Sequence, residues 1–168
     1  MYSMRGTVNS NRMILQVLDI LTLVITMIDS YDLLQMLSGS IQMNQHLLSV
    51  AAEAASSHDL KSALRRQSTE LDLLDDEIQK LVAMRGLDIP DLDPATRWWT
   101  GKVFHFSLTK KNTDVSIAEK MILSHTKDMI TTSRAVHVWE QPDTHLMMLQ
   151  QKIMDWNTVC IRQMLSFL

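Results

Sequence analysis

The sequence predicts an all-α protein in which four long helices form one bundle, preceded by an extra N-terminal helix. The 168 residues include only four glycines and three prolines, so few positions break a helix. Apolar residues recur every three or four positions along four stretches of about 25 residues each. No run alternates polar and β-branched residues as a strand does. We expect one domain overall, divided into an N-terminal amphipathic helix (1–30) and a four-helix bundle (31–168).

The N-terminal segment 13–28 is strongly apolar but carries one polar stripe, formed by Gln16, Asp19, Thr22 and Thr26. A signal peptide or a membrane anchor is the alternative interpretation. At the centre of a membrane span Asp19 would cost about 2.5 kcal/mol. The segment is also shorter than the roughly 20 residues that a span needs, and no small-residue cleavage site follows it. We therefore expect a packed amphipathic helix rather than a membrane segment.

The apolar face of this N-terminal helix is wider than a completed bundle can cover. Large exposed apolar patches are uncommon on monomers, so the face predicts a partner. A second copy is the simplest partner, which predicts a homo-oligomer formed through the N-terminal helix. A different protein partner would leave the same pattern. We do not expect a membrane surface as the partner, because the polar stripe lacks Lys and Arg.

Turn residues place the predicted bundle helices in two hairpins. The first two, 32–55 and 60–86, are joined by a short turn rich in capping residues, which predicts antiparallel neighbours. Residues 86–113 then break the pattern with two prolines and two glycines. A short helix is expected at 94–108, after the capping pair Asp93-Pro94. Its four aromatic residues are expected to pack on the bundle: Trp98, Trp99, Phe104 and Phe106.

The second hairpin follows from two further amphipathic stretches. One begins near Asp114 and the other near Asp143, separated by Pro142. Two hairpins joined by one long connection are the layout of a bundle with one long crossover.

Residues 32–168 resemble the small bacterial ferritin-like four-helix-bundle proteins of unknown function. HDLKSALRRQSTELDLLDDEIQKLVAMRG (58–86) looks like the second helix of that family, and RWWTGKVFHF (97–106) like its aromatic crossover. DTHLMMLQQKIMDWNTVCIRQM (143–164) looks like its last helix. The resemblance implies a ferritin-like bundle, in which the related di-iron proteins carry Glu-x-x-His on two helices. This chain contains no Glu-x-x-His, although the reversed spacing His125-x-x-Asp128 occurs. The metal ligands are therefore largely missing.

Each of the four apolar stripes contains one polar position near its middle or edge: Asn44, Gln67, His125 and Asn157. We interpret these residues as a buried, hydrogen-bonded layer that fixes the register of the helices. The alternative is a weak metal site formed by His125, Asp128 and Glu70, which would hold Fe, Mn or Zn with water completing the coordination. No catalytic residue and no cofactor is predicted.

Composition excludes several classes of function. The net charge is −3 and the basic residues are scattered, so a nucleic-acid partner is not expected. A single cysteine, Cys160, allows no internal disulfide and fits a cytoplasmic protein. The first functional hypothesis is a non-enzymatic, self-associating structural or interaction protein with a degenerate metal site. The alternatives are a di-iron-type oxidoreductase with atypical ligands and a helical adaptor that binds another protein through Met-rich faces.

Overall fold

The computed structural model describes the backbone of residues 5–109, 114–137 and 143–168, and the side chains of residues 30–105, 114–134 and 143–168. These residues form five helices and no strand, so the predicted all-α class is confirmed. The helices are α1 (Arg5–Ala54), α2 (His58–Met84), α3 (Pro94–Thr109), α4 (Asp114–His137) and α5 (Thr144–Leu165). No helix in the described part of the chain has the length and apolar character needed to cross a membrane.

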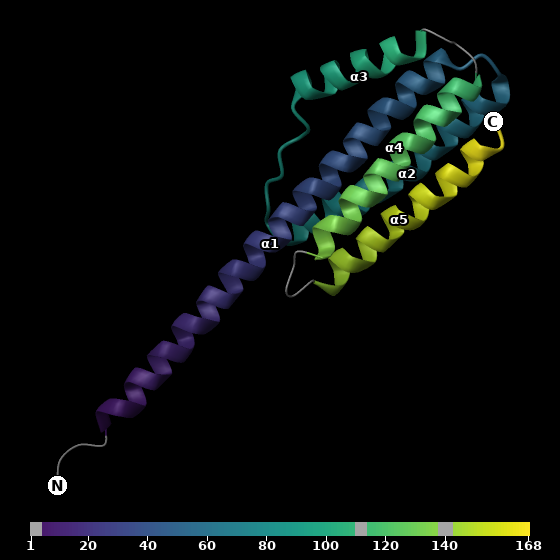
Figure 1. Ribbon diagram of the computed structural model, residues 1–168. Coiled ribbons are helices and arrows are strands. Elements are labelled where there is room, and N and C mark those ends of the chain that lie inside the picture. Colours follow the sequence, from purple (N-terminus) through teal and green to yellow (C-terminus); the bar gives the residue numbers. More distant parts are fainter. Residues whose placement is uncertain (1–4, 110–113, 138–142) are drawn as a thin grey trace.

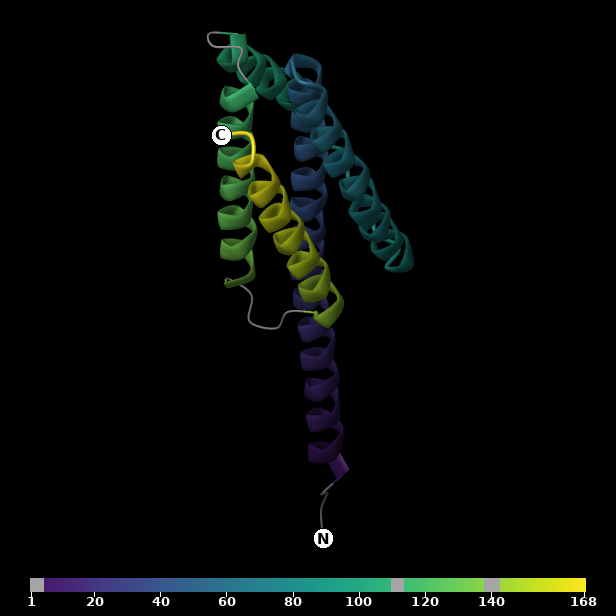
Figure 2. The ribbon, with the colours of Figure 1, turned by 90° about the vertical axis from the view of Figure 1, so that its right-hand side faces the viewer.

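The first helix differs from the prediction. We expected a separate N-terminal helix over 1–30 and a bundle helix from residue 32, but α1 is continuous for 50 residues. The expected break, Asp29-Ser30-Tyr31-Asp32, contains neither Pro nor Gly, so nothing in its backbone chemistry stops a helix. The N-terminal half of α1 runs as a single helix beyond the other described helices (Figures 1 and 2).

The C-terminal half of α1 packs with α2, α4 and α5 around a common core, and α3 lies outside this group against α1. Figure 1 shows α2 returning antiparallel to α1 and α5 antiparallel to α4. The connection after α2 runs back along α1 through α3, so that α4 starts at the end where α2 starts. Helices α2 and α4 are consequently parallel. We call the group of α2, α4, α5 and the C-terminal half of α1 the helical core.

Polar contacts at the two ends of the helical core hold the two helical hairpins together. At one end, the Asp114 carboxylate at the start of α4 accepts the backbone N–H groups of Ser56 (2.8 Å) and Ser57 (2.9 Å) in the α1–α2 turn. At the other end, Arg85 after α2 forms an ion pair of 2.5 Å with Asp143, the N-cap residue of α5. Each contact joins the end of one helical hairpin to the other hairpin.

The long connection is anchored to α1 by one buried amide. Gln42 accepts hydrogen bonds from the Leu92 N–H (2.6 Å) and from the Arg97 guanidinium (3.2 Å), and it donates to Asp91 (3.2 Å). The predicted cap of α3 is confirmed, because the Asp93 carboxylate accepts the Thr96 N–H at 2.9 Å.

The expected packing of the α3 aromatics is only partly correct. Phe104 packs against the core, but Trp98 and Trp99 are 59% and 65% exposed. The buried face of α3 is occupied instead by Gly101, which approaches His46 of α1 closely. Phe106 lies outside the residues whose side chains are described.

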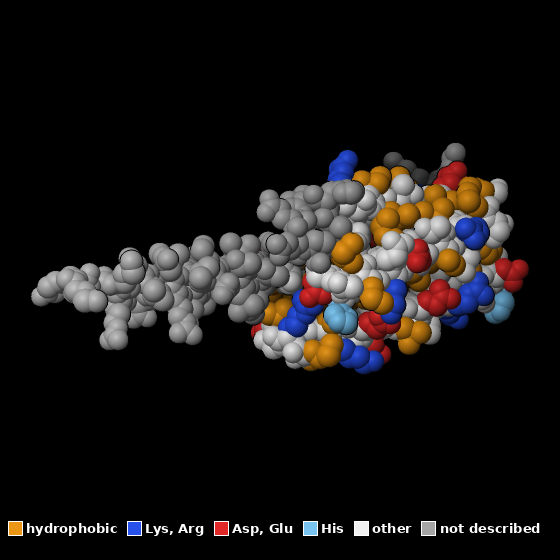
Figure 3. Space-filling view, turned by 90° about the horizontal axis from the view of Figure 1, so that it is seen from below, with side chains coloured by type: hydrophobic (Ala, Val, Ile, Leu, Met, Phe, Trp, Pro, Cys, Tyr) orange, Lys and Arg blue, Asp and Glu red, His pale blue; other side chains and the backbone are white. Residues whose placement is uncertain are grey.

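The predicted apolar stripes of the helical core are largely buried. The predicted stripes run from Leu60 to Leu81 on α2 and from Leu146 to Phe167 after the start of α5. All of their positions are buried except the last in each, Leu81 and Phe167, which are partly buried. On α4 the stripe is less regular, since Val115 is 40% exposed. Figure 3 shows one face of the molecule, on which positive, negative and apolar side chains are interspersed. Both signs of charge therefore share this face.

Candidate functional site

A chain of hydrogen bonds links three helices in the middle of the helical core. His125 Nδ1 of α4 lies 2.8 Å from Asn157 Oδ1 of α5. Asn157 Nδ2 donates to Asp128 Oδ2 of α4 at 2.8 Å, and Ser40 of α1 donates to Asp128 Oδ1. His125 and Asn157 are fully buried, whereas Asp128 is partly buried. We call these four residues the core polar network.

The network determines the tautomer of the imidazole. Both protons of Asn157 Nδ2 are used, one by Asp128 and one by the Ile153 carbonyl at 3.1 Å. Asn157 Oδ1 must therefore accept, so His125 Nδ1 carries the proton. In a neutral ring Nε2 then has no proton and carries a lone pair that can accept a hydrogen bond. His125 Nε2 is buried and has no hydrogen-bond partner among the described residues.

Burial dominates the electrostatics of His125. Removal from water lowers the pKa of the imidazole, because the charged form loses its hydration. The hydrogen bond to Asn157 and the negative charge of Asp128 act in the opposite direction, but they do not overcome the burial. The Trp156 ring packs against the imidazole in a T-shaped arrangement, with 5.2 Å between the ring centroids, and adds apolar surroundings. His125 is consequently neutral at physiological pH.

The four residues predicted to form a polar layer are all buried, but hydrogen bonds join only two of them directly. His125 and Asn157 bond to each other. Asn44 donates to the Ser40 carbonyl at 3.1 Å, one helical turn away in α1, and so lies beside the network. Gln67 of α2 donates instead to Gln163 of α5 at 2.9 Å. The polar positions therefore form two groups, one across α1, α4 and α5 and the other across α2 and α5.

The three weak metal candidates do not form one group. His125 and Asp128 lie in the core polar network, one turn apart on α4. Glu70 of α2 lies near the Cys160 thiol, where burial first and the Glu70 charge second raise the pKa of that thiol well above its usual range. Among the described residues no three or more His, Cys, Asp or Glu side chains gather as a metal ion would require. Asn157 lies between His125 Nδ1 and Asp128 and bonds to both, so these two candidates are joined through an amide.

An open groove of about 270 Å³ between α1 and α4 leads to the core polar network. Asp128, Ser40 and Asn44 line it, together with Met36 and Met43. Because both carboxylate oxygens of Asp128 already accept hydrogen bonds, the polar floor of this groove is occupied by partners from the chain itself.

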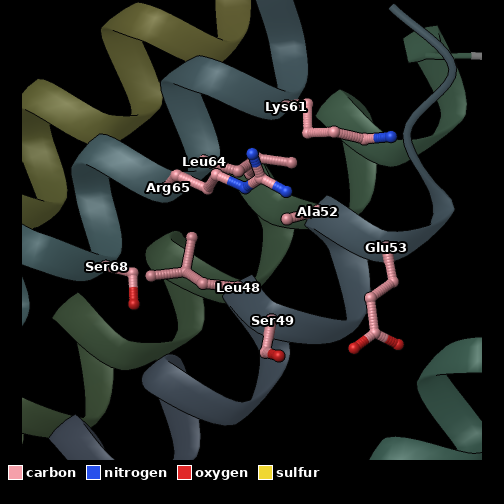
Figure 4. Close-up of a pocket in the computed structure, with 8 residues that line it drawn as sticks. All are labelled: Leu48, Ser49, Ala52, Glu53, Lys61, Leu64, Arg65 and Ser68. Carbon is pink, nitrogen blue, oxygen red and sulfur yellow. The ribbon is translucent and has the colours of Figure 1, made fainter. Parts of the chain in front are cut away.

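A larger groove, of about 460 Å³, lies between α1 and α2 and contains none of the predicted site residues (Figure 4). Lys61 and Arg65 come from α2, while Glu53 comes from α1. The buried residues Leu48 and Leu64 also line the groove. The groove combines an apolar base with charges of both signs and therefore has no single electrostatic preference.

Two members of these polar groups were not predicted from the sequence. Ser40 bonds to Asp128, and Gln163 bonds to Gln67. Ser40 lies one turn before Asn44 on the inward face of α1, and this spacing is the signal that identifies it. No comparable signal exists for Gln163, because its pairing depends on how α5 is rotated against α2.

Comparisons of the chain with protein-family models, with curated proteins and with solved structures found no match.

Proposed function

We propose that this chain is a non-enzymatic, ferritin-like helical scaffold that self-associates through the N-terminal half of α1. In this proposal the core polar network is a degenerate metal site that fixes helix register. The ferritin-like assignment is supported by two antiparallel pairs, α1–α2 and α4–α5, joined by a long crossover.

The direction in which α1 extends is the main support for self-association. Its N-terminal half runs beyond the helical core (Figure 1), and this half contains the apolar segment 13–28. A single helix that is apolar around most of its circumference needs other helices to cover it. A second copy supplies the same segment and can cover it without any additional protein.

Two substitutions of matched charge test this proposal. Residues two apart on a helix lie on nearly opposite faces, so Val24 faces away from the polar stripe that contains Thr26. We expect the native chain to be an oligomer, Val24→Asp to be a monomer and Thr26→Asp to remain an oligomer. Light scattering coupled to gel filtration measures the mass. A native chain that is monomeric at every concentration would refute self-association.

The degenerate-site interpretation rests on the hydrogen bonds of the network. The Asp128 oxygens accept from Ser40 and Asn157, and the imidazole is held by Asn157. Each bond crosses between two helices, so the network aligns α1, α4 and α5 along their axes. Such an alignment is a role that a buried polar group can play without a metal.

A metal-binding protein with atypical ligands is the second candidate, and one atom favours it. The lone pair of His125 Nε2 is buried without a described partner, and this is the atom that would bind a metal. Loading the purified chain with Fe(II), Mn(II) or Zn(II) and removing the excess tests both readings. His145 is exposed and serves as the control. Metal that is retained by the native chain and by His145→Ala but lost in His125→Ala favours the metal-binding protein. Metal content at background level favours the scaffold.

A further inference from the structure

The outer face of α3 is apolar and cationic although it lies on the surface. Trp98, Trp99 and Val103 are 59%, 65% and 52% exposed. The Trp98 and Trp99 rings lie 6.4 Å apart between centroids, and the Lys102 ammonium lies 5.5 Å from the centre of the Trp98 ring. Two neighbouring exposed tryptophans leave a large apolar area in water, which marks an interaction surface.

The opposite face of α3 is already used by the protein itself. Gly101 is buried against α1, Phe104 packs on the core and Arg97 donates to Gln42. These contacts fix the rotation of α3, so the tryptophans point outward because the inner face is occupied. Figure 1 shows α3 as the outermost helix on the side of α1 that faces away from α5.

The charge of this segment selects the kind of partner. Residues 94–113 contain four of the 16 basic residues of the chain and none of its 19 acidic ones, so the remainder of the chain is net acidic. A partner of negative charge is therefore favoured at this segment. Nucleic acid fits less well, because Lys102 is the described cation beside the tryptophans, whereas nucleic-acid binding uses several phosphate contacts.

A lipid surface fits both the aromatic and the cationic character. Tryptophan favours the boundary between lipid headgroups and acyl chains. A lysine can keep its charge among anionic headgroups while its methylene chain lies along apolar groups. A helix with Trp on its outer face and a cation such as Lys102 beside it can lie in the plane of the interface. The N-terminal helix lacks basic residues in its polar stripe, whereas α3 has the combination that such binding needs.

We propose that the outer face of α3, formed by Trp98, Trp99, Lys102 and Val103, binds the surface of a membrane that contains anionic lipid. The helix lies flat on the membrane and does not cross it. The helical core stays outside the lipid, because only α3 presents this face.

The test uses the full chain with vesicles of phosphatidylcholine, with and without phosphatidylglycerol. We expect sedimentation with the vesicles that contain phosphatidylglycerol, weakened by salt, and a blue shift of tryptophan fluorescence. Replacing both Trp98 and Trp99 by Ser should lower the partition coefficient at least about tenfold. Lys102→Gln should lower it about fivefold. Because these side chains are exposed, the variants should keep the native urea midpoint, which confirms that they are folded.

The matched control replaces two equally exposed apolar residues of α2, Leu73→Ser with Met84→Ser, which are 64% and 74% exposed. This control should bind vesicles like the native chain. Three results would overturn the proposal: no sedimentation of the native chain, equal binding by the double tryptophan variant, or equal loss in the α2 control. Equal binding by the tryptophan variant would place the lipid contact on another part of the chain. Loss of self-association in that variant, without loss of vesicle binding, would assign the face to a second copy.

Discussion

His125 Nδ1 and Asn157 Oδ1 lie 2.8 Å apart in the middle of the helical core, and this hydrogen bond joins α4 to α5. Asn157 also donates to Asp128, which in turn accepts from Ser40 of α1. One buried amide thus connects elements that are far apart in the sequence. The stability of the core should depend on this amide more than on any neighbouring polar residue of α5.

Asn157→Ala should lower the free energy of unfolding by about 3 kcal/mol, because it leaves the imidazole proton and one Asp128 oxygen without partners. Urea denaturation followed by circular dichroism measures this loss. The control is Thr158→Ala, one residue along α5 and exposed, which should change stability by less than about 0.5 kcal/mol. A loss below about 1 kcal/mol in Asn157→Ala would show that the network relaxes around the missing amide.

His125 should make the protein less stable as the pH falls. Burial lowers its pKa in the folded chain, so below the ordinary histidine pKa of about 6.5 the unfolded chain binds a proton that the folded chain does not. Stability is full above that pH and is lost progressively below it, by up to about 1.4 kcal/mol per pH unit. His125→Gln, which cannot take up a proton in this pH range, should remove this part of the slope. Urea midpoints between neutral and mildly acidic pH test the prediction, and an unchanged slope in His125→Gln would contradict it.

Asp143 should contribute to stability both as a helix cap and as an ion-pair partner. Its carboxylate accepts the His145 N–H at 2.8 Å and pairs with Arg85. Burial alone would raise the pKa of Asp143, but these two groups lower it below its usual value. The contribution is therefore present above about pH 4 and is lost as the pH falls further.

Two substitutions separate the roles of Asp143. Asp143→Ala should cost about 1 to 2 kcal/mol, since it removes both the cap and the ion pair. Asp143→Asn keeps a capping oxygen and should cost less than about 1 kcal/mol. Thermal unfolding of the two variants at neutral pH gives the comparison. Equal losses would mean that the charge, rather than the cap, dominates.

Gly101 and Gly39 should respond in opposite directions to the same substitution. A Cβ built on Gly101 would lie 2.1 Å from His46 Nε2, whereas a Cβ on Gly39 meets nothing within 4 Å. Gly39→Ala should stabilise the chain by about 0.5 to 1 kcal/mol through helix propensity. Gly101→Ala gains the same propensity but should show a net loss of about 1 to 2 kcal/mol, because α3 is pushed from α1.

The pair Gly101 and His46 also offers a rescue experiment. Replacing His46 by Ala removes the ring that an added methyl group would strike. Gly101→Ala should therefore become neutral or stabilising in the His46→Ala background, which a double-mutant cycle by urea denaturation measures. The same loss in both backgrounds would place the strain elsewhere in α3.

The helical class and most of the core could be predicted from sequence because helix periodicity is a local property. The stripes from Leu60 to Ile78 and from Leu146 to Met164 are buried as the spacing indicates, and Asp93 caps α3 as its neighbours suggest. The sequence also identified four of the buried polar positions, Asn44, Gln67, His125 and Asn157, because each one lies within or at the edge of an apolar stripe. These features depend on residues within a few turns of one another.

Contacts between helices were decided only by the tertiary structure. The sequence does not determine how far each helix is rotated or shifted against its neighbours, so it could not show that Gln67 pairs with Gln163 while Asn157 reaches Asp128. The outward position of Trp98 has the same origin, because the close approach of Gly101 to His46 sets the rotation of α3. The continuity of α1 through Tyr31 was missed because polar residues alone do not end a helix. Local patterns thus determined which residues are helical and buried, and packing between distant segments determined which polar atoms meet.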